Sequence, residues 1–339
     1  MSTSLNGSVD VIMPFRDAAA TIEEALDSVL SQRGVQTRVI AIDDGSRDAG
    51  PSIVLRMASR HSGVTSIKTP GFGVARAIAL GFAQSRTALV ARMDADDVSL
   101  PDRFSQQLDL LARDPRVAVA ATQVEIFPSG LGAGLERYVA WQNSLLSPAD
   151  HAREIFIESP LCHPTVLMRR TAICAVGGYR ETAGPEDYDL WLRIDAAGGA
   201  IAKVGAPLFK WRRHLGQATF SAPHYVAARF TETKAPSLAA RVSAAARGRR
   251  VVVWGAGPTG RRLARALTPH RICIALFVDI DPRKIGRVAR GVPIVSRDRL
   301  DRMRDFVVVA VGSLGARALI RSDLGARQFV ETIDFLCAA

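Results

Sequence analysis

The sequence VIAIDDGS at residues 39–46 is an apolar run that ends at two carboxylates, Asp43 and Asp44. A second run of this kind, ALVARMDADD, occupies residues 88–97. A packed interior does not tolerate clustered carboxylates unless they are paired or bind a cation, so each run indicates a buried strand that ends at a ligand. Ligands of open α/β sheets bind beyond the carboxyl ends of the strands. The two runs therefore predict an α/β sheet with a crevice for a divalent metal and a diphosphate.

Strands and helices are expected to alternate around these two runs. Apolar segments predict strands at residues 9–15, 38–42, 64–68, 88–93 and 117–127, with amphipathic segments between them. One helix should begin at Thr21, because Thr21 and Glu24 have the spacing of a capping box, and another should begin at Pro101. This alternation predicts a mostly parallel sheet with helices on both faces.

Length and charge predict more than one domain. The chain has 339 residues, and a single hydrophobic core usually stops growing at about 250–300 residues. Residues 236–339 contain 19 Lys and Arg against 8 Asp and Glu, so this part carries the entire net charge of +11. Residues 237–248, at the start of this part, are rich in Ala and Arg. We predict a first domain at residues 1–222, a helical linker at 223–248 and a small α/β domain at 249–339.

Composition argues against several classes of protein. No apolar stretch approaches the roughly 20 residues that cross a bilayer, and the first eight residues lack a secretory pattern, so we expect a cytoplasmic location. The four cysteines have no C-x-x-C spacing, and we expect them to be reduced. The basic C-terminal part has no zinc-finger spacing and no aromatic-interleaved basic stripe, which argues against nucleic acid. A solvated arginine face is the commonest explanation of such an excess of charge. Contact with an anionic membrane surface, at the inner face of the membrane, or with a lipid-linked acceptor is the functional alternative and is more plausible than nucleic acid.

The DADD group at residues 94–97 carries metal-binding chemistry. Asp94 and Asp96 lie one residue apart on a loop that leaves a strand. Their hard oxygens suit Mg²⁺ or Mn²⁺, whose remaining positions can take diphosphate oxygens. The alternative is a capped turn, in which Asp97 or Ser99 caps the helix that follows Pro101. The second acidic strand end at Asp43 and Asp44 favours the metal.

Eight short motifs have the order found in one known family. They are VIMPFRD at residues 11–17, DDGS at 43–46, GVAR at 73–76, DADD at 94–97, PLCHPTVLMRR at 160–170, GGY at 177–179, GPEDYDLWLR at 184–193 and WRRH at 211–214. Together they resemble the inverting glycosyltransferases of family 2 and cover about the first 220 residues. The resemblance implies a GT-A fold, which is a nucleotide-sugar-binding α/β structure with a mixed, mostly parallel sheet.

The resemblance also implies a reaction and its cofactor. The expected enzyme is a metal-dependent inverting glycosyltransferase of cell-surface polysaccharide biosynthesis. It moves a sugar from a nucleoside diphosphate, with UDP expected, to a hydroxyl of a glycan or lipid-linked saccharide. Mn²⁺ or Mg²⁺ is assigned to Asp94, Asp96 and His214, although a hydrogen-bonded surface histidine is the alternative for His214. Residues assigned to the nucleotide sugar are Pro14, Phe15, Arg16, Asp17, Asp44, Arg76, Asp94 and Glu186. Ala77 departs from the pattern, since the family usually has Asn there.

Asp187 is the residue to which the resemblance assigns the role of catalytic base. Inversion requires the acceptor hydroxyl to attack opposite the departing diphosphate and to lose its proton, and one carboxylate suffices for that. The alternative is that Glu186 and Asp187 are ordinary first-turn acids, which the helix dipole favours.

The C-terminal part contains a second motif, RRVVVWGAGPTG at residues 249–260. Gly255, Gly257 and Gly260 follow a predicted strand, and Asp279 lies 24 residues after the first glycine, as in dinucleotide sites. The segment resembles small Rossmann-like modules appended to sugar-modifying enzymes, which implies a nucleotide or dinucleotide ligand.

Three alternatives remain for the motif and for the whole chain. The glycines can mark only a tight turn in a module that binds nothing. The module can serve an NAD(P)-dependent oxidoreductase or a sensor, although about 90 residues leave no room for a dehydrogenase's catalytic domain. The chain can also be a non-catalytic nucleotide-sugar-binding protein.

Overall fold

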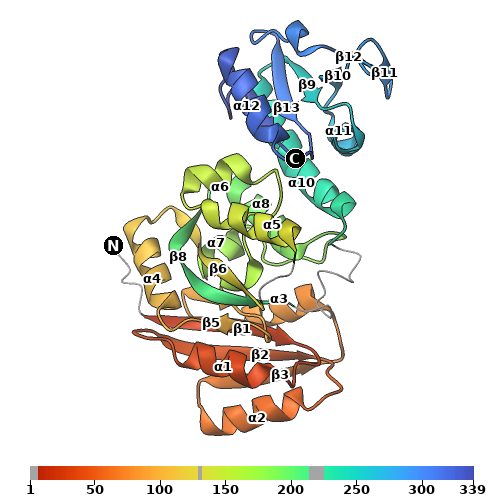
Figure 1. Ribbon diagram of the computed structural model, residues 1–339. Coiled ribbons are helices and arrows are strands. Elements are labelled where there is room, and N and C mark those ends of the chain that lie inside the picture. Colours follow the sequence, from red (N-terminus) through yellow and green to blue (C-terminus); the bar gives the residue numbers. More distant parts are fainter. Residues whose placement is uncertain (1–6, 129–131, 214–224) are drawn as a thin grey trace. The chain divides into compact units, whose positions relative to one another are not determined.

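The computed structural model describes residues 7–128, 132–213 and 225–339 (Figure 1). The chain divides into two compact units. The first contains Met1–Ala152, Pro160–Thr182 and Arg193–Ala222, and the second contains Arg153–Ser159, Ala183–Leu192 and Pro223–Ala339. The second unit therefore includes two short segments of the region that the sequence assigns to the first domain.

The first unit is built on an eight-stranded mixed sheet in the order β3-β2-β1-β4-β7-β6-β8-β5. β2 is parallel to β1 and β3, β4 is parallel to β1, and β6 is parallel to β8, whereas β7 runs antiparallel to β4 and β6. The mixed, mostly parallel sheet is thus confirmed. The strands are β1 (Ser8–Phe15), β2 (Gln36–Asp44), β3 (Val64–Thr69), β4 (Leu89–Arg92), β5 (Val98–Ser99), β6 (Val117–Phe127), β7 (Leu167–Arg169) and β8 (Ala200–Arg212).

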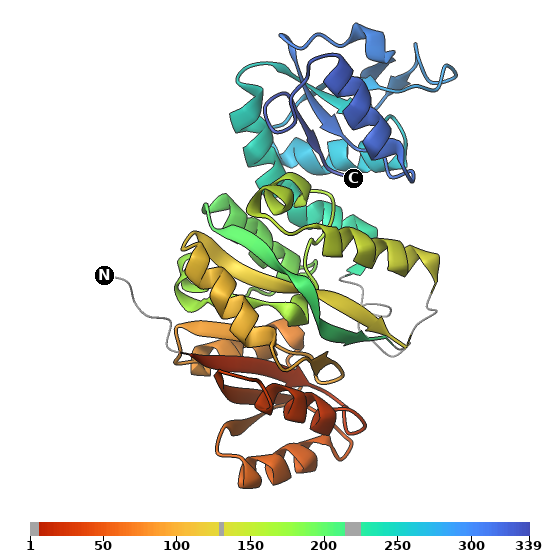
Figure 2. The same ribbon diagram turned by 60° about the vertical axis from the view of Figure 1, so that its left-hand side comes forward.

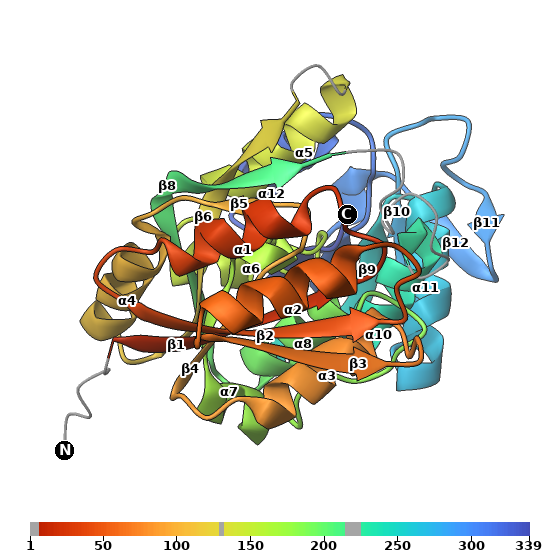
Figure 3. The same ribbon diagram turned by 90° about the horizontal axis from the view of Figure 1, so that it is seen from below.

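Helices cover both faces of this sheet. α1 (Ile22–Leu30) and α2 (Gly50–Arg60) lie on one face of β1–β3, and α3 (Val74–Gln84) lies on the other (Figure 3). α4 (Arg103–Arg113) packs on β6 and β8, two long strands that run side by side (Figure 2). The remaining elements are α5 (Ala133–Ser144), α6 (Pro148–Glu154), the 3₁₀ turn η1 (His163–Thr165) and α7 (Arg170–Ala175). Because both faces are covered, residues 11–15 of β1 and 39–42 of β2 are apolar and buried without a break.

The predicted capping box at the start of α1 is wrong. Thr21 is the N-cap residue, but its side chain makes no capping hydrogen bond. Its hydroxyl instead donates to the carbonyl of Ala95 at 2.9 Å, and Glu24 pairs with Arg212 at 2.5 Å. Both side chains therefore hold distant parts of the first unit instead of closing their own helix.

The second unit contains a six-stranded sheet in the order β11-β12-β10-β9-β13-β14. All its pairings are parallel except that of β11 with β12. Its strands are β9 (Arg250–Trp254), β10 (Ile274–Val278), β11 (Val288–Ala289), β12 (Val292–Val295), β13 (Asp305–Val309) and β14 (Phe335–Cys337). Its helices are α10 (Ala227–Ala246), α11 (Pro258–Leu267) and α12 (Ala316–Ala326). Two 3₁₀ turns, η3 (Thr268–His270) and η4 (Arg297–Arg299), complete the unit. The division between the units passes through α8 (Glu186–Ala196).

Among the residues that the structure describes, no helix combines the length and hydropathy that crossing a bilayer requires.

Gly81 in α3 gives a test of the packing between helix and sheet. Replacing a helical glycine with alanine usually stabilises a protein, but a Cβ at Gly81 would lie 2.6 Å from Cγ2 of Ile12 and 2.8 Å from Cδ1 of Ile42. We expect Gly81→Ala to lower the free energy of unfolding by about 1–3 kcal/mol. Gly134→Ala in α5, where a Cβ meets no atom within 4 Å, should raise it by about 0.5–1 kcal/mol. Urea denaturation measures both, and stabilisation by both variants would contradict the packing.

Candidate active site

The carboxyl ends of β1, β2 and β4 lie at one edge of the first sheet, because these strands are parallel neighbours. Phe15 pairs in register with Asp43, so the two loops that follow β1 and β2 leave side by side. Asp17, in the left-handed region with φ of 51°, accepts a hydrogen bond from the Arg47 amide at 2.7 Å. Its own amide donates to the Ser46 hydroxyl at 3.1 Å. The predicted nucleotide loop is thereby tied to the DDGS turn.

The two aspartates at the end of β2 have different surroundings. Asp44 uses both carboxylate oxygens within the protein: Oδ1 accepts from the Phe72 amide at 2.7 Å, and Oδ2 accepts from the Gly73 amide at 2.9 Å. Asp43 uses Oδ1 for the Ser46 amide, while its buried Oδ2 has no hydrogen-bond partner among the described residues. Asp43 is therefore the better-placed acceptor for a ligand N–H, although the sequence prediction chose Asp44.

The acidic residues after β4 form a cluster suited to a cation. Ligand oxygens of Asp94, Asp96 and Asp97 all lie within 4.8 Å of one another. Oδ2 of Asp97 is buried without a hydrogen-bond partner in the described part of the chain. Three hard oxygen donors, one of which lacks a hydrogen-bond partner in the described part of the chain, fit Mg²⁺ or Mn²⁺. Asp97, which the sequence treated as a possible helix cap, thus joins the predicted ligands Asp94 and Asp96. His214 lies outside the described residues.

The electrostatics of this cluster favour the binding of positive charge. Burial raises the pKa of Asp97 well above its usual value, and the charges of Asp94 and Asp96 raise it further. Burial also raises the pKa of Asp94, although the nearby charge of Arg92 opposes that shift. The Arg92 guanidinium lies 2.6 Å from Oδ1 of Asp94. The charges of the three carboxylates repel one another, so a divalent cation would relieve that repulsion.

Buried polar side chains hold the acidic loop in place. Oδ1 of Asp97 accepts from the Arg212 amide at 2.7 Å, and Nε of Arg212 donates to the Asp96 carbonyl at 2.6 Å. Fully buried Arg103 donates to the carbonyls of Arg92 at 3.0 Å and Pro164 at 2.9 Å. Burial lowers the pKa of Arg103 to about 9. Arg103 therefore holds the end of β4, just before the cluster, in place.

The other predicted nucleotide contacts line the same edge of the sheet. Pro14 and Phe15 are buried at the end of β1, whereas Arg16 is exposed and lies 3.9 Å from Asp17. Arg76, at the start of α3, pairs with Glu181 at 2.9 Å, and more than half of each side chain is exposed. Arg76 is therefore accessible to a ligand.

Asp187 and Glu186 begin α8 in the second unit. The Ser159 hydroxyl lies 3.4 Å from Oδ2 of Asp187, and the Tyr225 hydroxyl lies 3.3 Å from Glu186. Burial, followed by the neighbouring charge of Glu186, raises the pKa of Asp187 to about 7. A carboxylate with this pKa can accept a proton near neutral pH, as a general base must.

The glycine motif after β9 is explained in part by packing. A Cβ at Gly255 would lie 2.6 Å from the Ala310 carbonyl, and one at Gly260 would lie 1.8 Å from the Gly255 carbonyl. A Cβ at Gly257 would meet no atom within 4 Å. Asp279 already accepts from the Ala256 amide at 3.1 Å and from Lys284 at 2.9 Å. Gly255 and Gly260 therefore serve the turn itself, and Gly257 is the glycine with space beside it.

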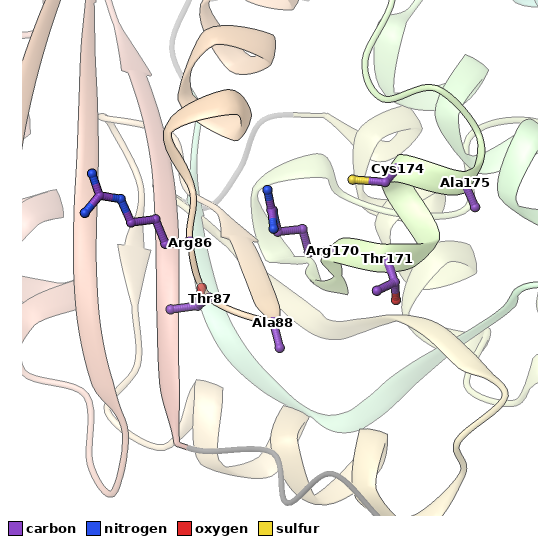
Figure 4. Close-up of a pocket in the computed structure, with 7 residues that line it drawn as sticks. All are labelled: Arg86, Thr87, Ala88, Arg170, Thr171, Cys174 and Ala175. Carbon is purple, nitrogen blue, oxygen red and sulfur yellow. The ribbon is translucent and has the colours of Figure 1, made fainter.

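A shallow pocket of about 560 Å³ lies at the opposite end of β4 from the acidic cluster. Figure 4 shows its lining on the loop before β4 and on α7, including Arg86, Arg170 and Cys174. No site predicted from the sequence falls there.

Known proteins resemble the first part of the chain. Residues 10–177 match the family described as "Glycosyl transferase family 2". The amylovoran biosynthesis glycosyltransferase AmsE of Erwinia amylovora is 26% identical over 206 residues, 60% of this chain and 75% of the relative. The UDP-Gal:alpha-D-GlcNAc-diphosphoundecaprenol beta-1,3-galactosyltransferase of Escherichia coli is 29% identical over 193 residues, 56% of this chain and 68% of the relative.

Solved structures agree with the fold. The crystal structure of S. aureus TarS 1-349 in complex with UDP-GlcNAc superposes with a TM-score of 0.58 at 16% identity, covering 78% of this chain and 72% of that chain. The mixed sheet described above is therefore the nucleotide-sugar-binding fold that the motifs predict. The protein is accordingly a glycosyltransferase, and its N-terminal part is a family 2 glycosyltransferase domain.

Proposed function

We propose that the protein is a metal-dependent inverting glycosyltransferase that uses a UDP-sugar and acts on a hydroxyl of a glycan or lipid-linked saccharide. The observation that carries the proposal is the cluster of Asp94, Asp96 and Asp97 at the carboxyl edge of the sheet, with a buried oxygen left without a partner in the described chain. A bound Mn²⁺ or Mg²⁺ would stabilise the negative charge that develops on the departing diphosphate. The galactosyltransferase relative, whose name includes a UDP-sugar and a diphosphoundecaprenol-linked saccharide, supports this choice of donor and acceptor.

Asp187 is the proposed general base of the transfer. The acceptor oxygen forms a bond to the anomeric carbon while the bond from that carbon to the diphosphate oxygen breaks. The acceptor proton passes to the Asp187 carboxylate, and the negative charge leaves with the nucleoside diphosphate. Asp43 is the proposed acceptor for an N–H of the nucleotide base, since Oδ2 of Asp43 is buried without a partner among the described residues.

Asp97→Asn tests the metal site. The control is Asp102→Asn, which replaces an exposed acid that is paired with Arg33. The amide keeps the acceptor for the Arg212 amide but removes a desolvated charge. We expect the metal-free variant to melt at a higher temperature than the wild type and to bind Mn²⁺ at least about tenfold more weakly. Calorimetric titration with Mn²⁺ and thermal melting measure the two effects. Wild-type Mn²⁺ affinity in Asp97→Asn would contradict the site.

Asp187→Asn tests the base. We expect transfer to fall by about 10²–10⁴-fold while UDP-sugar affinity stays within about twofold. In the wild type, kcat/KM should rise with pH and level off above about 7, because the pKa of Asp187 is raised to about 7 and only the deprotonated form accepts a proton. Initial rates from pH 5 to 9 measure this dependence. A pH-independent rate, or near-normal transfer by Asp187→Asn, would reject the assignment.

We also propose that the C-terminal residues contact an anionic membrane surface. Val288 is 65% exposed at the β11–β12 hairpin, and the exposed side chains of Arg287 and Arg290 beside it have no ion-pair partner among the described residues. Exposed apolar and cationic side chains together favour an anionic interface.

Co-sedimentation with phosphatidylglycerol-containing vesicles tests the membrane contact. The double variant Arg287→Glu/Arg290→Glu should bind at least about tenfold more weakly at low salt, whereas Arg60→Glu/Arg113→Glu, two exposed arginines of the first unit, should bind as the wild type does. Raising the salt concentration should release the wild type. Binding that ignores salt or the hairpin charges would contradict the contact.

A further inference from the structure

Residues 153–159 lie within the second unit, although they belong to the glycosyltransferase part of the sequence. Lys234 of α10 is the first contact that holds them there. Its ammonium group donates to the carbonyls of Phe156 at 2.7 Å, Ile157 at 3.0 Å and Ala338 at 2.8 Å. Lysine has three N–H donors, so all three are used. One buried side chain thus joins this segment to the C-terminal strand region.

Arg321 of α12 is the second contact. Its Nη2 lies 2.6 Å from Oε1 of Glu154 and 2.7 Å from Oε1 of Glu331. Glu154 is 3% exposed, and a carboxylate at that depth needs its partner, since an unpaired buried charge is costly. The C-terminal helix α12 therefore anchors the start of residues 153–159.

Apolar packing completes this attachment. Ile157 packs against the core of the second sheet, which includes Trp254, Val309 and Phe335. The Arg241 guanidinium of α10 lies 5.5 Å from the centre of the Phe156 ring. The segment is thus held by charge, by hydrogen bonds and by core packing, all supplied by residues after 226.

The same elements hold the turn that carries Asp187. The Tyr188 hydroxyl donates to the Ile155 carbonyl at 2.7 Å, and its ring lies 5.8 Å from that of Phe230 in α10. Gly184 lies so close to α10 that a Cβ there would be 2.1 Å from Oγ1 of Thr233. Asp187 therefore follows a turn fitted against α10, and Ser159, at the end of the anchored segment, donates to it at 3.4 Å.

We propose that the C-terminal module, residues 225–339, is a scaffold that positions Asp187 for proton transfer, with Lys234 and Arg321 as positioning residues. This inference rests on the proposed role of Asp187 as the base. The module then acts on the acceptor side of the reaction whether or not its glycine motif binds a ligand. If the module no longer contacted residues 153–159, Asp187 would lose the contacts that orient it.

The charged and polar groups around Asp187 set the expected pH behaviour. Glu186 adjoins it, Ser159 donates to it, Tyr188 follows it, and Glu158 faces Lys234. Burial makes the largest contribution to the raised pKa of Asp187. Loosening the scaffold admits water, so that pKa should fall and the acidic limb of the pH profile should move to lower pH.

Arg321→Met in the full chain is the test, and Arg327→Met is the matched control. Arg327 ends the same helix and pairs with Asp298 and Asp323, which lie outside the segment. We expect Arg321→Met to lower kcat by about 10–100-fold, to leave UDP-sugar affinity within about twofold, and to move the acidic limb downward. Hydrogen exchange should accelerate in residues 153–159 and 183–192. Arg327→Met should leave all four measurements near wild type.

Two milder variants keep the proposal testable if Arg321→Met does not fold. Arg321→Lys should retain much of the wild-type kcat. Glu154→Gln leaves the pair of Arg321 with Glu331 intact, and it should move the acidic limb of the pH profile downward by less than Arg321→Met does. Unchanged kcat in a folded Arg321→Met or Glu154→Gln protein overturns the scaffold. A loss without any shift of the pH limb or of hydrogen exchange also overturns it.

The base assignment and the scaffold fail in different ways. Normal transfer by Asp187→Asn rejects the base and therefore this inference with it. Loss of transfer in Asp187→Asn, combined with wild-type kinetics in Arg321→Met, rejects the scaffold alone.

Discussion

Three carboxylates, one buried and two partly buried, follow the end of one strand, and the surrounding structure compensates for part of their charge. Asp94 is paired with Arg92, Asp97 accepts the Arg212 amide, and one oxygen of Asp97 is left without a partner among the described residues. Mutual repulsion in a desolvated place makes positive charge the natural ligand. The parallel arrangement of β1, β2 and β4 then places the predicted nucleotide loop and the DDGS turn at that same edge.

The supports of this loop come from far along the chain. Thr21 and Glu24 belong to the first helix, yet their side chains contact Ala95 and Arg212. Arg103 crosses beneath the strand end to bind carbonyls of Arg92 and Pro164. The fully buried Arg103 guanidinium is stable there because it donates to these two carbonyls. Thr21, Arg212 and Arg103 thereby hold the acidic loop and the strand end before it in place.

Much of the fold followed from apolar periodicity. The predicted strands at residues 9–15, 38–42, 64–68, 88–93 and 117–127 correspond to β1, β2, β3, β4 and β6, because parallel strands covered on both faces are apolar along their length. Apolar periodicity predicts no strand after residue 127 in the first unit, yet that region contains α5, α6, α7, α8 and the 13-residue strand β8. Apolar periodicity does not predict β8, because this strand is only partly buried and its apolar residues do not form one unbroken run.

Local sequence patterns determined the acidic strand ends, the alternation of strands and helices and the turn glycine Gly260, since each depends on neighbours a few residues away. Gly255 depends on tertiary structure, because a Cβ there would lie 2.6 Å from the Ala310 carbonyl. Tertiary structure decided the rest. It left Oδ2 of Asp43 without a partner among the described residues and gave both oxygens of Asp44 a hydrogen bond. It also placed Asp97 beside Asp94 and Asp96, and it directed the Thr21 hydroxyl to the Ala95 carbonyl instead of to its own helix. It also joined residues 153–159 to Lys234 and Arg321. These outcomes depend on which distant donors a buried carboxylate or carbonyl meets, and hydrogen-bond partners brought together by folding leave no periodic trace in the chain.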